Sequence, residues 1–348
     1  MLRTVDSPTV PAENGRTRAT VLGFALAVAL LSVLVYLAGT DEVVAALLAA
    51  DAVVIGGLAV VVGCWIAVWG ASLRLVLRAF DQPAPPARTY LAYATMMFWD
   101  NVTPFSTVAA DPLAAGVLSR AFDVEYERSL AVVVTVDFFN FVPSPFFAAV
   151  GLLIVGSSAV AGGVIGRIAG PLLAVLVAAS VGSVLAWRHR RRLAAAAATV
   201  LGRLERTVRR LVPGLDRRTD LEFRRRATTL LDQLETVAAR RRTLAALLLC
   251  GVTGWALLSL GLWLSLYAVG VVVPLGVTLF AVPLVTVIEL IPLPGGVGGL
   301  EPLLVLLLAA TTGAPLATVT AGVLVFRLGT HVLPTALGGA AHPLLVYR

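Results

Sequence analysis

Long apolar runs dominate the chain, and most are close to the length of a membrane-spanning helix. A helix rises 1.5 Å per residue, so about 20 apolar residues cross roughly 30 Å of hydrocarbon. Six runs of that length predict full spans: Ala19–Ala38, Ala52–Leu73, Ser129–Ile154, Ile168–Trp187, Thr243–Val269 and Leu316–Leu337. The pattern predicts an all-α polytopic membrane protein.

Two further apolar regions are interrupted near their middle, and each half is too short to span a bilayer. The region from Tyr90 to Ala121 is interrupted at Asn101–Pro104, and the region from Gly276 to Thr311 at Pro292–Gly299. Non-helical backbone at membrane depth is tolerated only where protein or trapped water surrounds it. We therefore expect two re-entrant segments that point into the protein.

A shift of 190 residues aligns the two interrupted regions and the helices around them. The residue pairs that it superimposes include Trp65 with Trp255, Pro104 with Pro294, Asp111 with Glu301, and Asp137 with Arg327. Both halves have the order helix, broken segment, helix. The span at 168–187 adds one crossing between them, so we expect the second repeat to be inverted relative to the first.

The expected organisation has four parts. They are a cytoplasmic N-terminus at 1–18, a transmembrane half at 19–187 with the first repeat at about 52–155, a basic helical connector at 188–242, and a second transmembrane half at 243–348 with the second repeat.

Composition excludes a soluble enzyme, because 59% of the residues are hydrophobic and only 14% are charged. Charge then orients the chain. If each broken segment enters and leaves on one side, 25 of the 27 arginines lie on the same face. Cytoplasmic loops carry the excess of basic residues, so both termini and the connector are expected in the cytoplasm of a cell-membrane protein.

The connector at 188–242 carries sixteen arginines and six acidic residues. The basicity of the protein is local to this stretch, which argues against a nucleic-acid partner. Two amphipathic patterns within it fit a hairpin on an anionic lipid surface. A solvated connector whose charge only fixes orientation is the interpretation we favour.

The broken segments provide the candidate binding groups. The backbone N–H groups of Gly295, Gly296 and Gly298 are able to form a concave anion nest for a phosphate, with Asn101 and Thr103 at the other break. A tight turn that needs glycine only for packing explains the same pattern.

Several charged residues lie within apolar segments, where each uncompensated charge costs about 2.5–3.5 kcal/mol on insertion scales. Asp137 and Arg327 are expected to pair across the repeat interface, either as a structural ion pair or beside the substrate. His331 lies one turn after Arg327 and is a proton relay or a hydrogen-bond partner of Asp137. Glu289 and Glu301 are candidates for proton or cation coupling.

Asp111 is also a candidate for coupling, but it precedes a proline, which favours an N-cap at the start of a helix.

No enzyme signature is present: the chain has no GxSxG, no HExxH and no P-loop. Cys64 and Cys250 lie in apolar runs, far from any histidine cluster. We therefore expect no catalytic residues, no metal and no cofactor.

Three motifs resemble the lysylphosphatidylglycerol synthase transmembrane region, a flippase-like family. They are Asn101–Pro104 with Asp111-Pro112, Pro292–Gly298 with Glu301, and Phe326-Arg327-Leu328 with Pro334 and Gly338. The resemblance covers roughly residues 20 to 340 and implies lipid movement. It also implies a substrate role for Arg74 at the inner end of the second helix. The aminoacyl-transfer and glycosyltransferase domains of some members have no counterpart here.

The sequence thus predicts a membrane lipid translocator with a cavity near the bilayer midplane. Its partner is expected to be a phospholipid or a polyprenyl-phosphate lipid, bound through Arg327 and the glycines. The alternative is a non-catalytic accessory or carrier-binding subunit for an enzyme that acts on polyprenyl-phosphate glycans or modifies lipids. A small-solute transporter with the same repeats is a third class, and the oligomeric state stays open.

Overall fold

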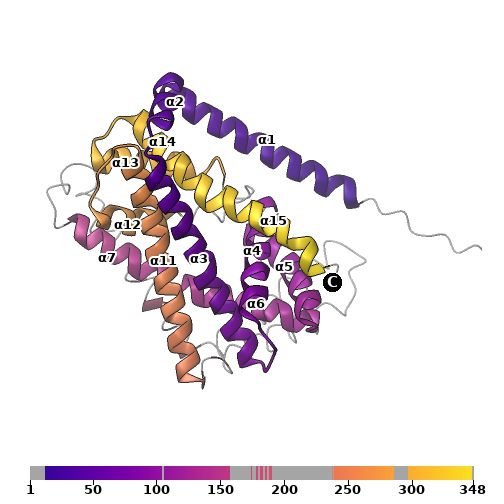
Figure 1. The fold of residues 1–348 in the computed structure, drawn as a ribbon. Helices are drawn as coiled ribbons and strands as arrows, with labels where there is room; N and C mark the ends of the chain where they lie inside the picture. The colour runs from indigo at the N-terminus through magenta and orange to yellow at the C-terminus, as the bar shows by residue number, and fades with distance from the viewer. Residues whose placement is uncertain are drawn as a thin grey trace, which may run out of the picture.

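The structure is a computed structural model that describes residues 12–103, 106–156, 239–285 and 297–346, with single positions between 174 and 237. Every regular element in these residues is helical, which confirms the all-α prediction (Figure 1). The helices are α1 (Ala12–Ala38), α2 (Thr40–Leu48), α3 (Ala52–Ala79), α4 (Pro86–Val102), α5 (Ser106–Phe122), α6 (Tyr126–Phe141), α7 (Ser144–Gly156), α11 (Arg241–Ala268), α12 (Leu275–Val285), α13 (Leu300–Thr312), α14 (Leu316–Arg327), the π-helix η4 (Leu328–Val332) and α15 (Leu333–Val346).

Four helical units in the described residues are long and apolar enough to cross a membrane: Ala52–Ala79, Tyr126–Val155, Arg241–Ala268 and Leu316–Val346. A fifth candidate is the pair formed by α1 and α2, which bends by 91° at Gly39. These units coincide with five of the six predicted spans. Most of the sixth, Ile168–Trp187, lies outside the described residues, as does most of the connector at 188–242.

The helix boundaries repeat along the chain. A shift of 190 residues takes the last residue of α5 to the last of α13. The same shift takes the first residue of α6 to the first of α14, and the last residue of α7 to the last of α15. The bounds of α3 and α11 agree with the same shift to within one residue. The repeat predicted from a few sequence identities therefore organises the helices as well.

The two repeats exchange packing partners. Helix α3 packs along its counterpart α11, α4 packs on α15, and α12 packs on α7 (Figure 1). Because α12 corresponds to α4 and α7 to α15, each broken region lies against the last helix of the other repeat. Such an exchange is what an approximate two-fold relation between the repeats predicts.

Glycines allow the exchanged helices to approach closely. Gly151 of α7 lies against the backbone of α12, and Gly338 of α15 lies against the carbonyl of Ala94 in α4. A Cβ atom at either glycine would overlap backbone atoms of the partner helix. Small residues are the usual means by which membrane helices pack this closely.

Non-helical residues are present at both predicted breaks. Thr103 follows α4, which ends at Val102, and Val297–Gly299 precede α13, which begins at Leu300. Of the second break, the structure describes Val297–Gly299, and Gly298 has a φ of 83°.

Two spans that the sequence predicts as continuous helices are interrupted at equivalent places. The break between α6 and α7 falls at Val142 and Pro143, and the π-helix η4 separates α14 from α15, which has Pro334 in its first turn. Proline lacks an N–H and clashes with the preceding helical turn, so the helix geometry changes at both sites.

Candidate functional site

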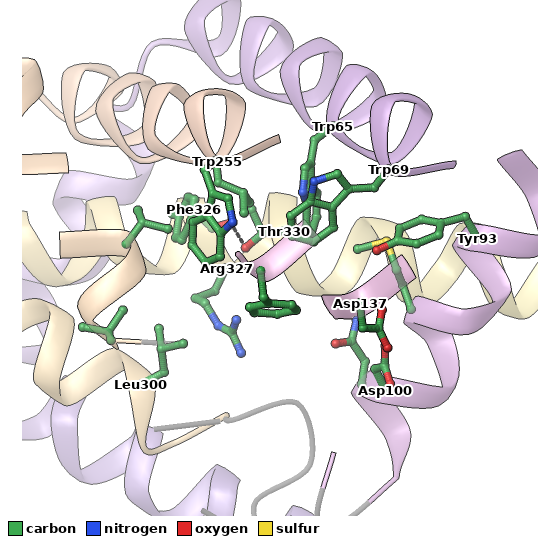
Figure 2. Close-up of a pocket in the computed structure, with 16 residues that line it drawn as sticks. Trp65, Trp69, Tyr93, Asp100, Asp137, Trp255, Leu300, Phe326, Arg327 and Thr330 are labelled. Atoms are coloured by element: carbon green, nitrogen blue, oxygen red, sulfur yellow. Dashed lines mark hydrogen bonds between the residues drawn. The ribbon is translucent and has the colours of Figure 1, made fainter. Parts of the chain in front are cut away.

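A cavity of about 140 Å³ lies between the two repeats. Its walls come from α3, α4 and α6 of the first repeat and from α11 to α14 and η4 of the second (Figure 2). One water needs on the order of 10–15 Å³ of such space, so the cavity has room for several waters or a small polar group.

The cavity is lined by both members of two residue pairs that the repeat makes equivalent. Trp65 and Trp255 form one pair, and Asp137 and Arg327 form the other. The site therefore straddles the repeat interface, and a residue of each half faces the same space.

Arg327 is bound to a carboxylate at the edge of the cavity. Its Nε atom lies 2.7 Å from Oε1 of Glu301. Glu301 is buried, with 1% of its surface exposed. The other oxygen of Glu301, Oε2, accepts a hydrogen bond of 2.7 Å from the backbone N–H of Gly298. Glu301 thus connects the cavity arginine to the turn before α13.

This contact bears on the predicted anion nest. Glu301 lies in the first turn of α13, which begins at Leu300, and its carboxylate folds back onto the preceding turn. The N–H of Gly298, predicted to belong to an anion nest, already donates to the chain's own carboxylate. Gly295 and Gly296 lie outside the described residues, as does Glu289, so their predicted roles stay predictions.

Asp100 and Asp137 lie together on the wall opposite Arg327 (Figure 2). Asp137 also interacts electrostatically with Asp100 and Asp111. Its predicted pairing with Arg327 stays a prediction, since the ion pair that the structure defines for Arg327 is with Glu301. The sequence interpretation missed Asp100, although an acidic residue directly before the break at Asn101 was a usable signal.

Asn101 lines the cavity and ties the end of α4 to the second repeat. Its Nδ2 atom donates to the backbone carbonyl of His331 at 3.2 Å and to Oγ1 of Thr335 at 2.8 Å. Thr103 follows as the C-cap of α4 and is not among the lining residues. His331 also lies outside the lining, and its Nδ1 atom is buried without a partner among the described residues.

Two predicted site residues occupy other places. Arg74 is not a lining residue; its Nε atom donates to the carbonyl of Ala84 at 2.9 Å, which fixes the connection between α3 and α4. Asp111 is not an N-cap, because α5 begins at Ser106 and continues through Pro112. Its Oδ1 atom is buried and has no hydrogen-bond partner in the part of the chain that the structure describes.

Aromatic rings close one side of the cavity, and the sequence interpretation did not assign them to the site. The ring centroid of Trp69 lies 5.2 Å from the ring centroid of Trp65 and 6.2 Å from that of Trp255. Trp255 donates its Nε1 hydrogen to the carbonyl of Asn140 at 2.8 Å, whereas the indole nitrogens of Trp65 and Trp69 have no partner in the described structure. The spacing of one helical turn between Trp65 and Trp69 was the available signal.

Among the described residues, no group of three or more His, Cys, Asp or Glu side chains is arranged to bind a metal ion. The cavity has an arginine on one wall, two aspartates on the other and indole rings above.

Comparison with known proteins agrees with this architecture. No curated protein matches the chain. The family model of the lysylphosphatidylglycerol synthase TM region matches residues 20–338, nearly the whole chain. The protein is an integral membrane protein involved in lipid handling, and it belongs to the lysylphosphatidylglycerol synthase transmembrane-region family.

Proposed function

We propose that the protein moves a phosphate-bearing lipid across the membrane by passing the headgroup through the cavity between the repeats. The observation that supports this most directly is the position of Arg327, which lines a cavity built from both repeats. Moving a headgroup through roughly 30 Å of hydrocarbon requires substitute hydrogen bonds and a counter-charge.

The charges of the cavity favour a headgroup that carries an amine beside its phosphate. Arg327 already faces Glu301, and Asp100 and Asp137 lie on the opposite wall. A purely anionic headgroup would find no positively charged partner on the wall formed by Asp100 and Asp137. A zwitterionic headgroup would place its phosphate near Arg327 and its ammonium near the aspartates, so that both charges gain partners.

The broken regions supply the route. Helices α4 and α5 pack on each other, as do α12 and α13, and residues of α4, α12 and α13 line the cavity. We propose that each pair is re-entrant, so that movement of one repeat against the other opens the cavity to alternate faces of the bilayer.

The remaining features of the proposal follow from charge. The protein belongs in the cell membrane, with both termini and the basic connector at 188–242 on the cytoplasmic side. It acts without chemically changing the lipid.

Binding of a lipid panel tests the substrate class. The purified protein in nanodiscs is offered phosphatidylethanolamine, phosphatidylglycerol, phosphatidic acid and a polyprenyl phosphate, and bound lipid is identified by mass. We expect preferential retention of the amine-bearing lipid with unchanged mass, and loss of that preference in Asp137→Asn.

Other outcomes point elsewhere. Retention of the polyprenyl phosphate without leaflet exchange would favour the carrier-binding role, and a changed lipid mass would make the protein an enzyme. Retention of no lipid at all would contradict the proposed function.

A further inference from the structure

Two hydrogen-bond donors from different parts of the second repeat converge on the carboxylate of Glu301. Arg327 Nε contacts one oxygen and the backbone N–H of Gly298 contacts the other, each at 2.7 Å. An arginine and a backbone N–H aimed at one group of oxygens are what proteins use to bind a phosphate or a carboxylate. The chain therefore contains an anion site that its own side chain occupies.

This occupied site adjoins the cavity. Arg327 lines the cavity with 13% of its side chain exposed, and Leu300, the residue before Glu301, lines it too (Figure 2). Glu301 is 1% exposed and is not among the lining residues. A ligand in the cavity meets the arginine first and the carboxylate behind it.

A headgroup phosphate and the Glu301 carboxylate oppose each other at this position. Two negative charges that share one site in a low-dielectric interior repel each other strongly. Binding of a phosphate to Arg327 is therefore unfavourable while the carboxylate stays in place. It becomes favourable if the phosphate takes over the contacts of the carboxylate.

We propose that Glu301 is a built-in competitor for the lipid phosphate, and that the headgroup binds by displacing its carboxylate from Arg327 and from the N–H of Gly298. This inference rests on the proposed function and names how the same cavity admits its substrate.

The exchange also gives the headgroup a mechanical effect. Gly298 has a φ of 83° and lies against α1, so that a Cβ atom built on it would be 2.9 Å from the carbonyl oxygen of Ala27 and 3.0 Å from Cβ of Leu30. Exchange of the Glu301 carboxylate for a phosphate at the N–H of Gly298 changes the hydrogen bonding of this turn where it touches α1. Headgroup binding is thereby linked to the packing of α1 on the second repeat.

The test measures the affinity of the full chain for dihexanoyl phosphatidylethanolamine, with inorganic phosphate as a second ligand. Glu301→Gln removes the competing charge and keeps the shape of the side chain. A hydrogen bond to a charged group is worth enough that we expect Glu301→Gln to bind the lipid about tenfold more tightly than the parent.

Asp137→Asn is the matched control, because it replaces a carboxyl group by an amide on the opposite wall of the same cavity. We expect it to bind the lipid no more tightly than the parent. Equal tightening by both variants would mean that overall cavity charge, not competition at Arg327, sets the affinity, and would overturn the proposal.

Failure of this inference is distinguishable from failure of the proposed function. If the parent binds the lipid and Glu301→Gln binds it equally or less tightly, the ion pair is structural and only the competitor role is lost. If neither binds the lipid, the proposed function fails. Binding of inorganic phosphate alone would show a free-phosphate site and would overturn the lipid assignment.

A second variant covers the case in which Glu301→Gln does not fold. Glu301→Ala leaves the two donors facing an empty position, which formate can enter. We expect formate to raise the melting temperature of Glu301→Ala and to weaken its lipid binding, with little effect on the parent. No response to formate in Glu301→Ala would contradict an exchangeable anion site.

Discussion

At the scale of single residues, the charged side chains of the cavity have partners that only the three-dimensional structure identifies. The repeat in the sequence was sufficient to place Asp137 and Arg327 at equivalent positions, and both line the cavity. The contact between Arg327 and Glu301 was not predictable, because it depends on how the turn at Val297–Gly299 folds back onto α13.

Arg327 and Glu301 are expected to be energetically coupled. Removing one partner of a buried ion pair leaves an uncompensated charge, so Arg327→Gln should lower the free energy of unfolding by about 3–5 kcal/mol. In the double variant Arg327→Gln with Glu301→Gln, part of that loss should be recovered. Denaturant unfolding in detergent gives the coupling energy.

The same double-mutant cycle on Asp137 and Arg327 tests the predicted contact across the repeats. Coupling between 137 and 327, with partial recovery when the two residues are exchanged, supports it. Additive losses would exclude contact between them.

The two equivalent tryptophans should respond differently to loss of the indole N–H. Trp255→Phe removes the hydrogen bond to Asn140 and leaves a buried carbonyl without that donor, which should cost about 1–3 kcal/mol. Trp65→Phe removes an N–H that has no partner in the described structure and should cost less. Unfolding midpoints of the two variants compare them directly, and a larger loss for Trp65→Phe would contradict the assignment.

At the scale of helices, length and hydropathy predicted the five span candidates among the described residues, because a bilayer demands a fixed length of apolar helix. The interruptions at Pro143 and at η4 were not predicted. Both halves of each interrupted unit are apolar, so a hydropathy pattern alone cannot separate one long helix from two joined ones.

The glycine contacts between exchanged helices are open to test. Gly338→Ala places a Cβ atom on the carbonyl of Ala94 and should destabilise the protein by about 1–3 kcal/mol, as overpacking does. Gly63→Ala is the control, because a Cβ atom there meets nothing within 4 Å and alanine favours the helix. Thermal unfolding in detergent should rank Gly338→Ala well below Gly63→Ala, and equal stability would refute the close approach of α4 and α15.

At the scale of the whole molecule, topology follows from the distribution of arginine. We expect a cysteine placed in 213–220, in a chain with Cys64 and Cys250 replaced by serine, to react with a membrane-impermeant maleimide only after the cells are opened. Labelling of that cysteine in intact cells would reverse the orientation.

The central claim is that the cavity between the repeats carries a lipid headgroup across the bilayer. Its most direct test is the rate of leaflet exchange of labelled phosphatidylethanolamine in liposomes that contain the parent, Arg327→Ala or Arg128→Ala. Arg128 is the control, because it contacts the carbonyl of Phe80 and does not line the cavity. We predict exchange well above that of protein-free vesicles for the parent and Arg128→Ala, and a loss of about tenfold or more for Arg327→Ala. Equal rates for Arg327→Ala and the parent would contradict the claim.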